Sequence, residues 1–182
     1  MPRQRHDPTK NLVGFLVGEV AYAVRIEAVR EIVNPLEVVE LPRAPLSVRG
    51  VASFRGEVVP VIDLRVRFGL GPIDGHRRNK WIIIDVTPRA RSAAHEPAPV
   101  QPAGRFIALV VDAVTDVFGT GGEQIRPAPA LGMGDDVRGI EGVVTHGGGL
   151  VFVLAVRAWS ALAEAVLRDN PSSRPGALSG AS

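Results

Sequence analysis

A weak internal repeat is the feature that most constrains the fold. Residues 50–62, "GVASFRGEVVPVI", resemble residues 142–154, "GVVTHGGGLVFVL", with matching glycines and matching alternate apolar positions. Residues 26–32, "IEAVREI", resemble residues 111–117, "VDAVTDV", and a short Pro-containing stretch follows each of these two pieces. The pieces keep the same order, and a half of about 70–80 residues would bury only a thin core. The repeat therefore predicts two similar β subdomains that pack on each other.

Period-two alternation and glycine turns predict most of the strands. Aromatic residues make up only 5% of the chain, so valine, isoleucine, leucine and alanine must fill the core, and a Val-rich, Gly-rich composition favours β structure. The predicted strands are residues 11–17 and 20–26 around Gly18-Glu19, residues 48–54 and 57–64 around Arg55-Gly56, residues 80–86, residues 105–111, and a hairpin over residues 142–156.

Two segments have the spacing of helices. Residues 26–33 place Val29 and Ile32 three positions apart, which predicts a short helix that ends before Asn34-Pro35. Residues 157–168, "RAWSALAEAVLR", carry apolar residues on one helical face and predict a C-terminal amphipathic helix.

Three segments have no apolar periodicity. Residues 1–10 are polar and predict a flexible N-terminal arm. Residues 87–104 are rich in Pro, Ala and charge and predict a mobile surface loop. Residues 169–182 are rich in Ser, Pro and Gly and predict a disordered tail.

Composition limits the classes of function. The chain has no cysteine, so it can have neither disulfides nor thiol chemistry, and its formal net charge is only +2. It has no apolar run of about 18 residues, and its polar start lacks the apolar core of a signal peptide. We therefore expect a soluble, cytoplasmic protein that does not insert into a membrane.

The residues form no convincing catalytic set. The four histidines have no metal-type spacing, and the Gly-rich stretches at 119–122 and 147–149 lack the Lys-Ser/Thr of a phosphate loop. Asp63 is not followed by the Thr/Ser-Gly of an aspartic protease. Asp112 and Asp116, one helical turn apart, could bind a metal, although solvated acids or caps are the interpretation we favour. We expect no enzyme activity, no cofactor and no metal.

Two stretches remain as candidate binding surfaces. Residues 75–81, "GHRRNKW", combine basic side chains with one Trp, so a small-barrel nucleic-acid-binding protein is an alternative, although a solvated loop accounts for the stretch as well. Arg55 stands at a predicted hairpin tip, where it could pair with an acid such as Glu31 or Glu57, or anchor an interface.

The motifs of several segments resemble those of the CheW family of chemotaxis coupling proteins. They are residues 29–32, "VREI"; the P-x-x-P at 42–45; residues 48–70, "VRGVASFRGEVVPVIDLRVRFGL"; and residues 109–131 and 140–156 in the same order. The resemblance covers residues 11–168 and implies a mainly β domain of two intertwined, five-stranded SH3-like barrels with short helices and a C-terminal helix.

The resemblance also implies function and sites. Family members are non-catalytic adaptors that couple the cytoplasmic tip of chemoreceptors to the regulatory domain of the CheA-type histidine kinase in a signalling array. The implied receptor-binding residues are Val29, Glu31, Gly50 and Arg55. The implied kinase-binding residues are Val38, Arg126, Ala130 and Leu131. Ser53 and Phe54 depart from the family's usual Asn and aliphatic residue, and Ala130 and Leu131 from the acid and aromatic of some members.

Overall fold

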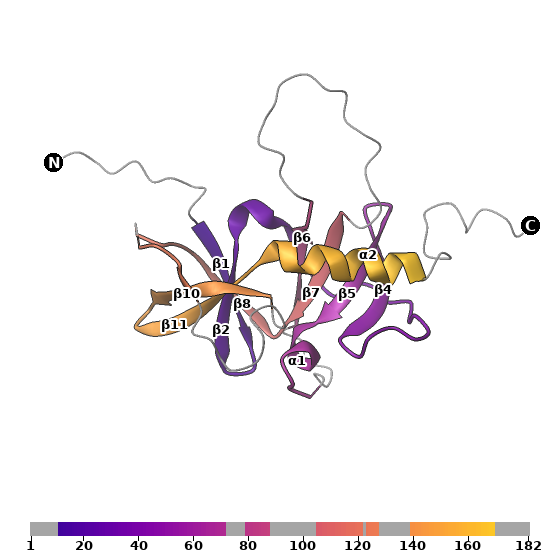
Figure 1. The fold of residues 1–182 in the computed structure, drawn as a ribbon, viewed down its shortest axis with the longest axis horizontal. Coiled ribbons are helices and arrows are strands. Elements are labelled where there is room, and N and C mark those ends of the chain that lie inside the picture. Colours follow the sequence, from indigo (N-terminus) through magenta and orange to yellow (C-terminus); the bar gives the residue numbers. More distant parts are fainter. Residues whose placement is uncertain (1–10, 72–78, 88–104, 122, 128–138, 170–182) are drawn as a thin grey trace, which may run out of the picture.

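Two β-sheets and a C-terminal helix make up the described part of the chain (Figure 1). The structure is a computed structural model, and it describes residues 11–71, 79–87, 105–121, 123–127 and 139–169. The six-stranded sheet has the spatial order β8 (Ala113–Gly119), β1 (Asn11–Val17), β2 (Val20–Arg25), β11 (Gly149–Leu154), β10 (Ile140–His146) and β9 (Arg126–Pro127). The five-stranded sheet has the order β3 (Val29–Val33), β6 (Lys80–Asp85), β7 (Phe106–Val111), β5 (Glu57–Asp63) and β4 (Val48–Phe54).

The helices are short apart from the last one. They are η2 (Ile26–Ala28), α1 (Leu64–Arg67), η3 (Val156–Trp159) and α2 (Ser160–Asp169). Figure 1 shows α2 crossing from the β10–β11 hairpin towards the five-stranded sheet. Trp159 and Ala163 anchor it in the largest buried cluster. The prediction of a C-terminal amphipathic helix is confirmed.

The predicted mainly β fold with two strand-rich subdomains is confirmed, as are the three predicted hairpins. The six-stranded sheet has one strand more than expected, because the two residues of β9 pair with β10. At the matching place in the other sheet, Val39 makes only an isolated bridge to Val51. The predicted arm, and nearly all of the predicted loop and tail, lie outside the described residues.

The predicted helix over residues 26–33 is wrong beyond Ala28. Val29–Val33 form strand β3, which pairs with β6. The register shifts between Val29 and Glu31, so Arg30 is an extra residue in the strand, a β-bulge. Asp112 and Asp116 likewise do not share a helix, because Asp116 lies in strand β8. The helical spacing assumed for these two acids is therefore wrong.

The internal repeat appears in the structure as two halves that exchange strands. β1 and β2 come from the first half but pair with β8 and β11 of the second, and β10 and β9 continue that sheet beyond β11. β6 and β7 come from the second half but pair with β3 and β5 of the first, and β4 continues that sheet beyond β5. The registers match as well: Ala23 lies opposite Val153 in one parallel pair, and Ala108 lies opposite Val61 in the other.

Successive residues of the central strands point to opposite faces of the sheet and pack into different buried clusters. Ile82 and Ile84 of β6 point into the largest cluster, which lies between the sheets and includes α2 residues. Trp81 and Ile83 of the same strand belong to a second cluster made mostly by the five-stranded sheet. A third cluster belongs to the six-stranded sheet. The strands are thus buried on both faces, which explains the unbroken apolar run of residues 81–84.

Candidate functional site

The β4–β5 hairpin presents Arg55 at an unfavourable backbone conformation. Arg55 has a φ of 51° and Gly56 a φ of 82°, the pattern of a tight two-residue hairpin turn with both central residues left-handed. Glycine or asparagine would adopt this conformation at lower cost than arginine. The Arg55 side chain is 62% exposed, and its guanidinium carbon lies 5.5 Å from the centre of the Phe54 ring. An arginine kept at such a position suggests a role outside folding.

Arg55 forms an ion pair with Glu31, one of the two acids that the sequence offered. Nη2 of Arg55 lies 2.7 Å from Oε2 of Glu31. Glu31 belongs to β3 and Arg55 follows β4, and these strands are the opposite edges of the five-stranded sheet. The sheet must therefore curl until its two edges approach each other. Both side chains remain partly exposed, so the pair contributes at most about 1 kcal/mol to stability.

The other two receptor-side candidates have structural roles. Val29 is half-buried and packs against the largest cluster, as expected for a core residue. Gly50 is buried at a φ of 143°, and a Cβ there would lie 2.1 Å from the carbonyl oxygen of Val39. Of the four receptor-side candidates, the structure brings only Glu31 and Arg55 into direct contact.

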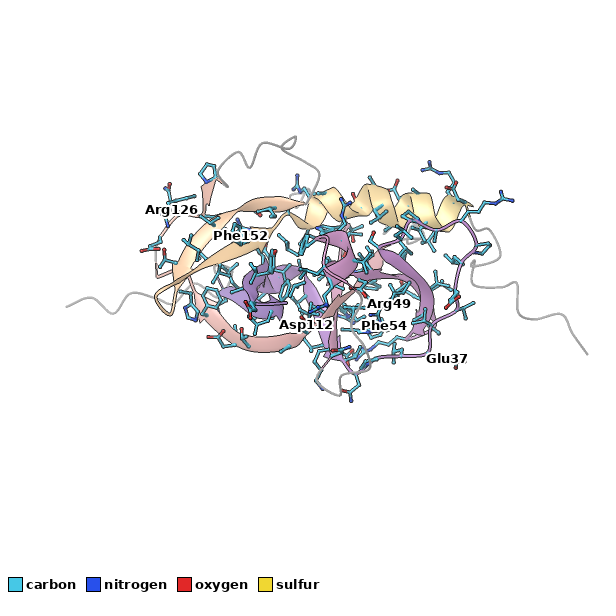
Figure 2. All side chains as sticks on the ribbon, turned by 90° about the horizontal axis from the view of Figure 1, so that it is seen from below. Glu37, Arg49, Phe54, Asp112, Arg126 and Phe152 are labelled. Atoms are coloured by element: carbon cyan, nitrogen blue, oxygen red, sulfur yellow. The ribbon has the colours of Figure 1, made fainter. Side chains whose placement is uncertain are left out.

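The kinase-side candidates fall at opposite ends of the molecule. Val38 is half-buried against the core of the five-stranded sheet and also borders Gly50, which the resemblance assigned to the other partner. Arg126 is exposed on β9 and donates from Nη2 to Oγ1 of Thr145, 3.1 Å away. Figure 2 shows Arg126 at one end of the long axis and Glu37, the neighbour of Val38, near the other end. Ala130 and Leu131 lie outside the described residues.

The six-stranded sheet has its own counterpart of the Glu31–Arg55 pair, which the sequence did not reveal. Asp116 matches Glu31 in the repeat, and its Oδ2 lies 2.8 Å from Nε2 of His146, next to the β10–β11 turn. The His146 ring stacks on Phe118 at a centroid distance of 3.7 Å. The hydrogen bond from His146 holds the pKa of Asp116 below its ordinary value. In both halves a cross-strand acid therefore meets a side chain at or next to the hairpin turn, although His146 stands at the position of Phe54, one residue before that of Arg55.

Asp63 has a structural role that the sequence also did not reveal. Its side chain is 1% exposed, and Oδ2 accepts hydrogen bonds from Nε and Nη2 of Arg49 at 2.8 and 2.5 Å. Oδ1 accepts from the backbone amides of Arg65 and Val66 and so caps α1. The carboxylate joins β4, β5 and α1, and all its oxygens are engaged.

Within the described residues, no group of three or more His, Cys, Asp or Glu side chains is arranged to hold a metal ion. None of the helices in the described part of the chain has the length and hydropathy that crossing a bilayer requires. His146 is engaged by Asp116, and Gly147 and Gly148 form a turn at positive φ between β10 and β11.

Comparison with known proteins identifies the family to which this fold belongs. The family model described as the CheW-like domain matches residues 11–164, nearly the whole described region. The chain belongs to the CheW family. It is 30% identical over 122 residues to the probable chemotaxis protein CheW of Rhizobium etli, covering 67% of this chain and 68% of that protein. It is 27% identical over 156 residues to the chemotaxis protein CheW of Klebsiella aerogenes, covering 86% and 84% of the two chains.

A solved CheW has the same fold. The crystal structure of the scaffolding protein TtCheW from Thermoanaerobacter tengcongensis matches with a TM-score of 0.65 and 26% identity, over 80% of this chain and 88% of that one. The resemblance and the fold class predicted from the sequence are confirmed, and so is the prediction of a chemotaxis adaptor. The nucleic-acid alternative receives no support from these comparisons, and most of residues 75–81 lies outside the described residues.

Proposed function

We propose that the protein is a non-catalytic, cytoplasmic adaptor that couples chemoreceptors to a CheA-type histidine kinase within a signalling array. Membership of the CheW family carries this proposal, because the match covers both sheets and not one isolated motif. The relative of solved structure is named a scaffolding protein. The role of the present protein would be to hold its partners together without catalysing a reaction.

We assign the receptor side to the surface around the Glu31–Arg55 pair. Arg55 is the centre of this surface because it is exposed at a hairpin tip and adopts a conformation that costs stability. Guanidinium groups are frequent anchors of protein interfaces, since they donate several hydrogen bonds in a fixed plane. Glu31 orients the guanidinium. Val29, the first residue of β3, fixes this strand on the largest buried cluster. Gly50 allows residues 38–39 to lie against β4.

The kinase side is proposed for two separate surfaces. Val38 lies in a connection that also exposes Val39 and Leu46, which are 62% and 93% accessible. Exposed aliphatic side chains beside a strand edge suit an interface with another β domain. Arg126 belongs to the other end of the molecule. Ala130 and Leu131 are proposed together with it because they follow it closely in the sequence. An adaptor with contact surfaces at both ends could link neighbours in an array.

Substitution of Arg55 tests the receptor side. Arg55→Ala and Arg55→Glu should each weaken binding to a chemoreceptor tip fragment by about tenfold or more, measured by calorimetry, because one charged anchor is lost or reversed. Arg168→Ala, at an exposed arginine of α2 with only a 3.9 Å contact to Glu164, is the control and should bind normally.

Kinase binding should survive both Arg55 substitutions, and thermal unfolding should confirm that the fold is intact. Receptor affinity unchanged in both variants would remove Arg55 from the site. Failure of the unaltered protein to bind either a receptor fragment or the kinase regulatory domain would contradict the adaptor function itself.

A further inference from the structure

A cavity rimmed by charged side chains lies beside the start of η3, and its lining includes neither Glu31 nor Arg55. Its volume is about 690 Å³, and the charged residues that line it are Arg25, Glu27, Asp85, Arg105, Glu141 and Arg157. Four of them form two ion pairs. Arg25 pairs with Glu141, and Nε of Arg105 lies 3.0 Å from Oδ2 of Asp85.

These pairs leave a clear electrostatic signature. The hydrogen bond with Glu141 raises the pKa of Arg25. Burial alone would raise the pKa of Asp85, but the hydrogen bonds from Thr87 and Arg105 outweigh it and lower that pKa. In both pairs, each charge therefore already has a partner of opposite sign.

Arg157 differs from the other two arginines. It is exposed at the rim of the cavity, and within the described part of the chain its guanidinium makes no hydrogen bond or ion pair.

The internal repeat allows the surroundings of Arg157 to be compared with the equivalent site in the other half of the molecule. The cavity residues around Arg157 have direct counterparts there: Arg157 matches Arg65, Glu27 matches Asp112, and Thr87 matches Gly18. The matching backbone hydrogen bonds support the equivalence, because Asp63 donates to the carbonyl of Ser47 and Ala155 donates to that of Gly139, both at 2.7 Å.

At the equivalent site around Arg65, a following segment of the chain itself supplies the contacts. Arg65 donates from Nη1 to Oδ2 of Asp112 at 2.8 Å and from Nε to the carbonyl oxygen of Gly71 at 2.9 Å. Leu70 packs over Gly18, where a Cβ would lie 2.9 Å from its methyl carbon. After α1 the chain turns back, so Leu70 and Gly71 close the site.

In the second half nothing equivalent follows Arg157. η3 continues directly into α2, which runs towards the five-stranded sheet (Figure 1). Charged side chains replace aliphatic ones in the lining, with Asp85 at the position of Leu16 and Arg105 at that of Val20. These substitutions suit a surface that water reaches when no ligand is bound.

We propose that this cavity is a docking site for an extended peptide segment of a partner protein, which places an aliphatic side chain beside Thr87 and, one residue later, an oxygen acceptor on Arg157. Thr87 has a Cβ where Gly18 has none, so this aliphatic side chain lies farther out than Leu70 does over Gly18. The acceptor is a backbone carbonyl or a carboxylate, as the Leu70-Gly71 segment demonstrates with its own carbonyl on Arg65. A carboxylate forms the stronger, charge-assisted hydrogen bond. This site does not depend on the proposed chemotaxis function.

Two tetrapeptides test the proposal. Acetyl-Phe-Gly-Leu-Gly, the sequence of residues 68–71, is titrated into the full chain once with a free C-terminal carboxylate and once as the C-terminal amide. NMR should show saturable shifts of the backbone amides of Ala28, Thr87 and Val156. The acid should bind roughly threefold to tenfold more tightly than the amide, because its carboxylate stands at the acceptor position.

The variant Arg157→Ala should remove the difference between the two peptides, and Arg168→Ala should keep it. The proposal is overturned if neither peptide shifts these amides, or if the preference for the acid persists in Arg157→Ala. A further variant replaces residues 90–102 by a Gly-Ser linker. Binding that appears only in this variant would identify the chain's own segment as the occupant and would also overturn docking of a partner.

Discussion

Gly50 and Gly142 are the two described glycines whose missing side chain leaves room for another backbone segment. A Cβ would lie 2.1 Å from the carbonyl oxygen of Val39 at the first and 2.3 Å from that of Arg126 at the second. Each glycine lies next to a register shift in its strand. The match of glycines seen in the sequence therefore has a physical cause, because in each half a neighbouring segment crosses a bulge too closely for any side chain.

The glycine positions give a prediction at the scale of single residues. Gly50→Ala should lower the free energy of unfolding by about 3 kcal/mol, since it combines overpacking with a strained φ. Gly56→Ala should cost only about 1 kcal/mol, because no atom lies within 4 Å of the place that its Cβ would take and only the backbone strain remains. Urea unfolding of the two variants checks the difference. Equal losses would show that the contact with Val39 does not matter.

Among the elements, β3 and β8 show why hairpins are easier to predict than bulged strands. The β4–β5 and β10–β11 hairpins keep regular alternation from Gly50 and Gly142 to their glycine turns, because their bulges lie at the ends away from the turn, so the sequence predicts them correctly. β3 and β8 each contain one extra residue opposite their partner strand. That residue moves the next apolar side chain from i+2 to i+3, and Val29 and Ile32 then imitate one turn of a helix.

The candidate site was also only partly predictable from local sequence patterns. Arg55 could be singled out from the sequence because a charged residue at a hairpin tip is conspicuous. Its pairing with Glu31 rather than Glu57 depends on the curvature of the whole sheet, which local patterns do not encode. The pairing of Asp116 with His146, 30 positions apart, depends on curvature in the same way.

The Asp116–His146 pair predicts a pH dependence of the six-stranded sheet. The folded-state pKa of Asp116 is lowered, so its stabilisation is present above the unfolded value of about 3.9 and is lost as the pH falls through the folded value. His146→Gln should raise the pKa of Asp116 towards the ordinary value, measured by NMR titration of the carboxyl carbon. The pKa of Asp85 should stay low in this variant, since Thr87 and Arg105 hold it. An unchanged Asp116 pKa would contradict the role of His146.

At the scale of the whole molecule, the exchange of strands makes the two halves inseparable. Neither sheet can form without strands from both halves, and the largest core contains residues of β1, β2, β5, β6, β7 and α2. Ile62 and Leu109, for example, are both fully buried there although they come from different halves. The repeat alone predicts two similar units, but it does not say to which sheet each strand belongs. That follows only from long-range pairing.

Strand exchange predicts that the chain behaves as one cooperative unit. Fragments 1–75 and 76–182 should each be largely unfolded alone, because β3 then lacks β6, and β1 lacks β8. Mixed in equal amounts, they should recover the β-sheet circular dichroism of the intact chain and its hydrogen-exchange protection. Ile82→Asp in the second fragment, at a position with 0% exposure, should prevent the recovery, since a buried charge would face the core between the sheets. A dispersed NMR spectrum with protected amides in either fragment alone would show that one half folds without the other.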